Sequence, residues 1–486
     1  MLLWLLTQLP DAPLWLTKIT PRAALAVLAG FLLAVLLGSR WIGWLRRRFR
    51  EPIVSDSPTV ERLHRDKQST PTMGGLFIVG SLVAGVVALA DLSSPYVHAA
   101  LIGVVLLAVV GAVDDLKKLR SGKRGLAPRT KLIAQTVVAS IVAGYIYSAH
   151  RDVPGALQFA IPLTGTSWSL GWLFVPWAVL VIVGSSNAVN LADGLDGLAG
   201  GCLIFAAAAV AALAYAGGHA QWAEYLGVPH IPGCGEMFVV ASCMIGGVLG
   251  FLWFNCHPAQ VFMGDTGSLP LGGLLGILAL VARQELLLVV IGGVFVAEAL
   301  SVIVQVGWYK WKRRRLLLCA PLHHHFQFKG IAENKIVVRF WIASALCALL
   351  GVASVKLTGA PDDAPPHETR RAPSVSFEVA QTSRGAAASN SLGREPQEIV
   401  IETILEAPKG QHRETPRYMS PLRGFPFHNR LFLGLAPQAI CCRPSGTKQN
   451  VISEGISSRV MWWHALSLKP KDELPTASRP PLADRK

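Results

Sequence analysis

Charged side chains are scarce in this sequence: Asp, Glu, Lys and Arg together account for 15% of its 486 residues, whereas 52% are hydrophobic. A soluble domain usually carries about 25% charged residues. The deficit reflects long apolar runs, several of them close to the roughly 20 residues that a helix needs to cross a bilayer. This composition excludes an ordinary soluble fold, in which each helix buries only one stripe of its surface.

Paired cysteines are also lacking. The eight cysteines are scattered, without CxxC pairs or the spacing of metal ligands, and this pattern predicts structural or inert residues. The N-terminus has neither an early basic region nor a clear cleavage site, so we expect no removable signal peptide. The sequence contains no internal repeat.

Ten apolar segments have the length and hydropathy of membrane-spanning helices. They lie near 22–45, 73–91, 97–113, 130–149, 171–190, 197–215, 237–254, 268–282, 286–306 and 336–356. The predicted fold class is therefore all-α, with a polytopic membrane domain over residues 22–358. Residues 1–21 are broken by prolines and are expected to form an interfacial segment. Residues 359–486, rich in Pro, Ser, Arg and Glu, are predicted to be a mostly disordered tail.

The net charge of +15 is concentrated in alternate loops. The loops 46–72, 114–131 and 307–335 carry seven Lys or Arg residues each, and the four opposite loops carry only Arg151 and Arg283. The positive-inside rule then places the three basic loops in the cytoplasm. Membrane orientation and contact with anionic lipid explain this charge better than nucleic-acid binding, which we do not expect.

Acidic residues cluster at helix ends beside these basic loops, where a buried charge is costly and usually functional. Asp114 and Asp115 end one span and could hold a divalent cation or accept a proton; a solvated helix end fits them equally well. Asp265 lies between two glycines, just before another span. It fits a Mg²⁺ ligand, and Asp265 or Ser268 could also cap the following helix.

A second polar stretch places Asn187, Asn190, Asp193 and Asp196 at intervals of three residues. On a helix running into a turn, this spacing brings them near one face. Amides and carboxylates suit the directional hydrogen bonds that a nucleobase and a ribose need, and the following Gly194 lets the backbone approach a ligand closely. The alternative is a polar seam between helices.

Three adjacent histidines, His323, His324 and His325, lie in the last basic loop. They lack the i, i+4 spacing of a helical zinc motif, but could bind phosphate or hold metal-bound carboxylates in place. The stretch 310–315 would attract anionic substrate or lipid, although topology control accounts for most of its charge. Lys67 fits a phosphate contact.

Seven motifs, in this order and spacing, resemble those of the phospho-N-acetylmuramoyl-pentapeptide transferases of bacterial cell-wall synthesis. They are TPTMGG (70–75), DD (114–115), SNAVNLADGLDGLAGG (186–201), FLWFNCHPAQVFMGDTGSLPLGG (251–273), FVAEALSVIVQV (295–306), PLHHHFQFKG (321–330) and ENKIVVRFWI (333–342). The resemblance covers about 40–358. It implies a multi-pass enzyme of the bacterial cytoplasmic membrane that uses UDP-N-acetylmuramoyl-pentapeptide, undecaprenyl phosphate and Mg²⁺, with its active site facing the cytoplasm. The sequence leaves open whether the enzyme forms a homodimer.

The resemblance also implies roles for individual residues. Asp265 looks like the Mg²⁺ ligand, Asp114 looks like the group that engages or deprotonates the lipid phosphate with Asp115 beside it, and the three histidines match the family's triplet. The nucleotide and diphosphate pocket would be lined by Lys67, Thr72, Asn187, Asn190, Asp193, Gly194, Leu195, Asp196, Asn255, Phe262, Ser268 and Gln305. Departures from the usual family residues occur at Ser69, Ala192, Thr266 and Gln327, and none removes an expected catalytic group.

Two alternative functions fit parts of this pattern. A sibling transferase acting on another UDP-HexNAc would share the aspartates and Mg²⁺, whereas the full HHHF and TPTMGG motifs favour the muramoyl-pentapeptide branch. A membrane transporter would place polar groups near the midplane of the bilayer, whereas here they gather at one membrane face.

Overall fold

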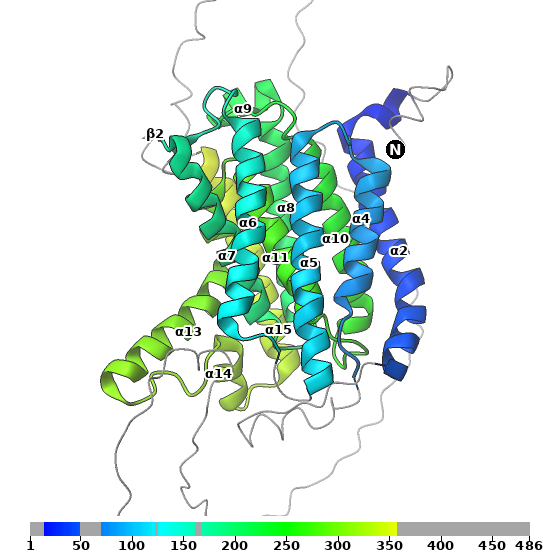
Figure 1. The fold of residues 1–486 in the computed structure, drawn as a ribbon, viewed down its shortest axis with the longest axis vertical. Coiled ribbons are helices and arrows are strands. Elements are labelled where there is room, and N and C mark those ends of the chain that lie inside the picture. The colour runs from blue at the N-terminus through cyan, green and yellow to red at the C-terminus, as the bar shows by residue number, and fades with distance from the viewer. Residues whose placement is uncertain (1–13, 49–69, 122–124, 161–166, 357–486) are drawn as a thin grey trace, which may run out of the picture. The chain divides into compact units, whose positions relative to one another are not determined.

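The computed structural model of the chain describes residues 14–48, 70–121, 125–160 and 167–356 (Figure 1). All of them lie in one compact unit. The predictions for Lys67, for most of the N-terminal segment and for the tail at 359–486 lie outside the described residues.

Helices dominate the described part of the chain. They are η1 (Leu14–Thr17), α2 (Ile19–Arg48), α4 (Gly75–Leu89), α5 (Pro95–Ser121), α6 (Pro128–His150), η3 (Gly171–Leu173), α7 (Phe174–Ala192), α8 (Leu198–Gly217), α9 (Ala220–Leu226), α10 (Glu236–Asn255), α11 (Asp265–Val281), α12 (Glu285–Ile291), α13 (Gly293–Lys312), α14 (Leu322–Phe328) and α15 (Glu333–Lys356). Two short antiparallel strands, β1 (Gln158–Ala160) and β2 (Ser167–Ser169), pair with Phe159 opposite Trp168.

Seven of the described helices are long and apolar enough to cross a membrane, and an eighth span results if α12 and α13 are counted together. The apolar helices α4 and α11 are shorter. With them, each of the ten predicted segments has a helical counterpart, which confirms an all-α, polytopic membrane fold. Large apolar side chains such as Leu28, Ile133 and Leu346 remain more than half exposed. In a bilayer these surfaces face hydrocarbon.

The prediction of one continuous span over 286–306 was wrong. The chain bends by 84° between α12 and α13, at Gly292 and Gly293. Glycine has the lowest helix propensity after proline, and two in succession weaken the helix at that point. As a result, α13 leaves the bundle at an angle, as Figure 1 shows.

The core helix of the bundle is α11, in which every residue is buried. It packs mainly against α5 and α7, and small residues allow the close approach. A Cβ atom at Gly111 of α5 would lie 2.2 Å from the Asp265 carbonyl oxygen, and one at Gly272 would lie 2.6 Å from the Ser185 carbonyl oxygen. The start of α11 is therefore fixed closely against its neighbours.

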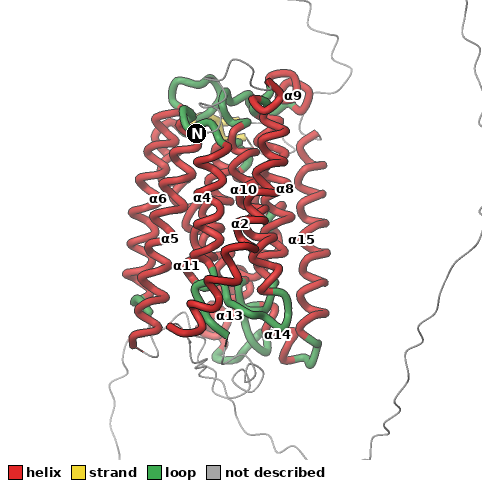
Figure 2. Tube along the Cα trace, turned by 90° about the vertical axis from the view of Figure 1, so that its right-hand side faces the viewer, coloured by secondary structure: helices red, strands yellow, loops and turns green. Residues whose placement is uncertain are grey.

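The two ends of the bundle differ. At the end drawn lowest in Figure 1, here called the lower end, lie the last turns of α2 and α5, helix α14 and the end of α13, whereas α9 and the β strands lie at the opposite end (Figures 1 and 2). The opposite end is joined by a buried ion pair between Arg22 and Glu236, with Nη2 and Oε1 2.6 Å apart. The second Glu236 oxygen accepts a hydrogen bond from the Asp91 backbone N–H at 2.8 Å, so this carboxylate links α2, the α4–α5 loop and α10.

Candidate active site

A backbone pairing connects the start of α4 to the loop before α11. The N–H of Phe262 donates to the carbonyl of Pro71 at 2.9 Å, and the N–H of Gly74 donates back to Phe262 at 2.8 Å. The N–H of Gly75 donates to Met263 at 2.8 Å. A Cβ atom at Gly75 would lie 2.1 Å from a backbone nitrogen of α11, so only glycine permits this contact.

Asp115 reaches from α5 to cap the N-terminus of α11. Its carboxylate accepts hydrogen bonds from the backbone N–H groups of Asp265 at 3.2 Å and Thr266 at 2.9 Å, and from the Thr266 hydroxyl at 2.7 Å. These N–H groups have no partner within their own helix. The capping role considered for Asp265 or Ser268 is therefore carried out by an aspartate of another helix.

Asp114, Asp115 and Asp265 meet at the lower end, where all three are buried. Two ammonium groups lie among them. Lys118 Nζ lies 2.9 Å from Asp114 and 2.7 Å from Asp265, and Lys131 Nζ lies 2.6 Å from Asp265. Buried like charges are costly unless they are paired, so the two lysines are needed to hold the carboxylates together.

The same three carboxylates have the chemistry of a metal site. Each offers an oxygen, and these atoms lie within 4.8 Å of one another. Hard divalent cations prefer such all-oxygen donors. Because the Asp115 oxygens also cap α11, Asp114 and Asp265 are better placed to hold an ion. The acidic cluster can therefore bind a metal ion.

Polar side chains of α6 and α7 extend the cluster. Asn190 Nδ2 donates to Asp265 at 2.6 Å and to the Ser268 hydroxyl at 2.8 Å. One turn earlier, Asn187 donates to Gln135 at 2.9 Å. The Asn190 amide thus fixes Asp265 from α7, whereas the Asn187 amide is engaged with α6.

Asp193 directly follows α7 and is partly buried. Burial and, to a smaller extent, the negative charges of Asp265, Asp115 and Asp196 together raise its pKa to about 7. The predicted spacing of three residues therefore brings Asp193 into the electrostatic field of the acidic cluster.

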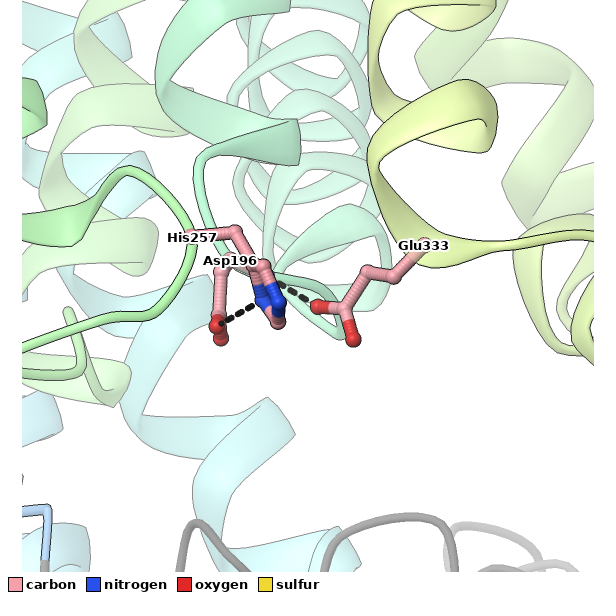
Figure 3. Close-up of side chains that lie close together, drawn as sticks. All are labelled: Asp196, His257 and Glu333. Carbon is pink, nitrogen blue, oxygen red and sulfur yellow. Dashed lines mark hydrogen bonds and ion pairs between the residues drawn. The ribbon is translucent and has the colours of Figure 1, made fainter. Parts of the chain in front are cut away.

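Asp196 joins three segments of the chain at the lower end (Figure 3). Its carboxylate lies 3.0 Å from His257 Nδ1 and accepts a hydrogen bond from the Ala259 N–H at 3.1 Å, while its own N–H donates to Glu333 at 3.0 Å. Asp196, His257 and Glu333 also have the proximity of a metal site. The contacts above make them a hydrogen-bonded junction between three segments.

The Asn255 side chain connects the same loops through hydrogen bonds to their backbone. The N–H of Gly197 donates to its side-chain oxygen at 2.9 Å, and its Nδ2 donates to the Val261 carbonyl at 2.8 Å. Gly197 has a φ of +78°, which favours glycine at this turn. Leu195 is buried beside it, and Phe262 remains partly exposed.

The three histidines occupy α14 in different surroundings. His323 is buried and its ring lies against Gly194. His324 Nδ1 lies 2.8 Å from Gln327, and His325 Nδ1 accepts a hydrogen bond from the Leu318 N–H at 3.2 Å. Burial lowers the pKa of His325, and the neighbouring Lys329 lowers it further.

Gln305 holds the loop that leads to the histidines. Its side-chain oxygen accepts hydrogen bonds from the N–H groups of Leu316 at 3.1 Å and Leu317 at 2.9 Å, and its Nε2 donates to the Leu317 carbonyl at 3.2 Å. Both polar atoms of this amide are therefore engaged with the backbone of the loop.

Most of the predicted site residues lie at the lower end, linked by the contacts above; Thr72 is buried beside Gly264 and Asp115. Their roles toward substrate stay predictions. Sequence reasoning missed Lys118, Lys131, Gln135 and Glu298. Of these four residues, only Lys118 could have been found from the sequence, because it follows Asp114 at the i+4 spacing of helical ion pairs.

Comparisons with known proteins identify the family of the chain. The model of glycosyl transferase family 4 matches residues 97–283. The phospho-N-acetylmuramoyl-pentapeptide-transferase of Nitratidesulfovibrio vulgaris strain DP4 is 46% identical over 341 residues, which are 70% of this chain and 94% of the relative. The enzyme of the same name from Solidesulfovibrio magneticus is 45% identical over 347 residues, with the same coverage. The chain therefore belongs to the phospho-N-acetylmuramoyl-pentapeptide-transferase family.

Proposed function

We propose that this enzyme transfers phospho-N-acetylmuramoyl-pentapeptide from its UDP donor to undecaprenyl phosphate, releasing UMP and forming the lipid-linked diphosphate. The names of its relatives support this reaction. The single observation that carries it is the buried acidic cluster of Asp114, Asp115 and Asp265, with Lys118 and Lys131 among the carboxylates. This arrangement fits a reaction between two anions.

The main obstacle to the proposed reaction is the repulsion between the negatively charged phosphate groups of donor and acceptor. A phosphate oxygen of the acceptor attacks the phosphoryl group attached to the sugar, so two anions must approach each other. Fixed cations lower this repulsion, and their effect is strong at a buried site of low dielectric. The ammonium groups of Lys118 and Lys131 are in place for this role. A bound Mg²⁺ would add positive charge on the phosphate oxygens, and we assign Asp265 and Asp114 as the residues that hold it.

The remaining predicted residues would bind the donor. Asp193 and Asn190 extend from the acidic cluster along α7, and Phe262 remains partly exposed for contact with a base. The histidines of α14 would contact the diphosphate. Asn255 and Gln305, whose amides hold backbone, would act by shaping the loops around the nucleotide.

The fold also suits a lipid acceptor. A polyprenyl tail must stay in hydrocarbon while its phosphate reaches the site, which a multi-pass membrane protein permits. We propose that the lower end faces the cytoplasm of a bacterial cell. Lys118, Lys131 and Lys310 lie on helices at or toward this end, whereas Arg151 and Arg283 lie at the opposite end, and positive charge is concentrated on the cytoplasmic side of membrane proteins.

The test is a comparison of two donors. Purified protein is mixed with undecaprenyl phosphate and either UDP-N-acetylmuramoyl-pentapeptide or UDP-N-acetylglucosamine, and UMP release is measured. We expect release with the first donor only. Release with the second donor alone would assign the sibling reaction, and absence of release with both would contradict a transferase of this class.

A further inference from the structure

Glu298 is a buried carboxylate that the proposed reaction does not use. It lies on α13 with no exposed surface, after the bend that separates this helix from α12. Such a group is costly in hydrocarbon unless it is paired, and residues of this kind are usually functional. The partner of Glu298 is His323, the first histidine of the triplet.

The two residues make a two-point contact. The backbone N–H of His323 donates to Glu298 Oε1 at 3.2 Å, and His323 Nδ1 lies 3.1 Å from Oε2. An ionised carboxylate only accepts hydrogen bonds. In a contact with an ionised Glu298, Nδ1 is the donor, and Nε2 is the ring atom that is left for another partner. The hydrogen bond made by one imidazole nitrogen sets the state of the other in this way.

The other ring nitrogen of His323, Nε2, points away from Glu298 toward Gly194. This atom is buried and has no hydrogen-bond partner among the described residues. It faces the loop after α7: a Cβ atom at Gly194 would lie 2.2 Å from it. Buried polar atoms almost always have partners, and an exception needs an explanation such as a ligand. Nε2 therefore lies unpaired among the described residues beside Gly194, which follows Asp193 in the chain.

We propose that Glu298 is a positioning residue for the donor substrate: it holds the His323 ring so that Nε2, at Gly194, hydrogen-bonds the bound UDP-sugar. The inference rests on the proposed function, and it assigns a role to a residue of α13, the helix that precedes the histidines' helix α14 in the chain. A purely structural carboxylate would need only the backbone N–H of His323. The second contact, to the ring, is what sets Nε2.

The main test is Glu298→Gln. An amide offers one acceptor, so it cannot accept from both the backbone N–H and Nδ1–H of His323. We expect the KM for the donor to rise by about tenfold or more, with a much smaller change in kcat, because the lost contact is made by ground state and transition state alike. Glu285→Gln, which neutralises a buried carboxylate paired with Arg283 at the opposite end, is the matched control and should leave this KM within about twofold.

The state of the ring gives a readout that needs no substrate. In ¹⁵N spectra of histidine-labelled protein, the resonances that disappear in His323→Gln identify this ring. We expect a protonated Nδ1 in the wild type and an altered pattern in Glu298→Gln. A wild-type ring with Nδ1 unprotonated would overturn the proposal, as would an unchanged donor KM in Glu298→Gln.

A second variant reaches the same ring from the other side. Gly194→Ala displaces Nε2 and leaves Glu298 intact, so the donor KM should rise while Nδ1 stays protonated. If Glu298→Gln does not fold, this variant decides, and an unchanged KM in it overturns the proposal. Wild-type protein that releases no UMP would instead contradict the proposed function, and the spectra would still test the Glu298–His323 pair.

Discussion

The carboxylate of Asp115 accepts two hydrogen bonds from Thr266, one from its backbone N–H at 2.9 Å and one from its hydroxyl at 2.7 Å. Thr266 is the second residue of α11, whereas Asp115 belongs to α5. The positive end of a helix dipole favours a carboxylate at this place. The position of Asp265, the first residue of α11, is therefore fixed from the neighbouring helix as well as by its own loop.

Replacing Asp115 by alanine should lower both stability and activity. The variant leaves buried N–H groups at the start of α11 without an acceptor, and loss of a cap costs about 1–2 kcal/mol. Thermal unfolding in detergent and UMP release measure the two effects. Asp115→Asn keeps one acceptor oxygen and should fall between wild type and alanine. An alanine variant as stable as the wild type would contradict the capping role.

Asp265→Asn and Asp114→Asn should each reduce turnover by about a hundredfold or more, because each removes a carboxylate assigned to hold Mg²⁺, whose charge would stabilise phosphoryl transfer. Asp152→Asn is the control, since its side chain is 79% exposed at the opposite end of the bundle. UMP release from folded protein is the measurement. Near-normal rates in either site variant would reject its assigned role.

Removal of divalent cations with EDTA should stop turnover, and added Mg²⁺ should restore it, because oxygens of three carboxylates lie within 4.8 Å of one another, close enough to share one cation. Binding can be followed without turnover by titrating Mn²⁺ and recording electron paramagnetic resonance. We expect a saturable site in the wild type that is lost in Asp265→Asn. Equal Mn²⁺ binding by both proteins would place the ion elsewhere.

Lys131→Gln should have opposite effects on metal binding and on catalysis. Loss of the ammonium group 2.6 Å from Asp265 leaves the cluster more negative, so Mn²⁺ should bind several-fold more tightly. Turnover should nevertheless fall by about tenfold, since a cation that offsets phosphate charge is gone. Lys117→Gln, on the exposed side of α5, is the control. A parallel loss of both properties would indicate general damage to the site.

Deletion of residues 361–486 should leave turnover largely unchanged. Helix α15 ends at Lys356, and the family motifs found in the sequence end before that residue. The measurement is UMP release by the truncated protein after its insertion into membranes has been verified. A truncated protein that inserts normally but is inactive would assign the tail a role in catalysis.

Hydropathy was sufficient to predict the helices because long apolar runs have few alternatives in a membrane. Hydropathy missed the bend at Gly292 and Gly293, because the mean hydropathy of a whole segment does not reflect two glycines within it. It also made α4 too long, at 73–91 instead of Gly75–Leu89, whereas the segment predicted for α11, 268–282, was already short. Helix length within a bundle depends on neighbouring helices, which the hydropathy of one segment does not describe.

The aspartates, amides and histidines of the site were predicted because polar groups at membrane boundaries are conspicuous in an apolar chain. Their partners were not. Lys131 and Glu298 stand in sequence among ordinary basic or apolar residues, and only tertiary packing brings them to Asp265 and His323. Asp115 was predicted as a reactive group, whereas its observed contacts are those of a cap.

The complete burial of α11 has a consequence for how the enzyme tolerates different membranes. At 17 residues the helix is only about 26 Å long, shorter than the roughly 30 Å hydrocarbon layer. A lipid-facing helix of this length would suffer hydrophobic mismatch and would tilt or thin the bilayer around it. Because α11 touches protein on every side, variation in bilayer thickness acts on the outer helices, and the depth of Asp265 is buffered against lipid composition.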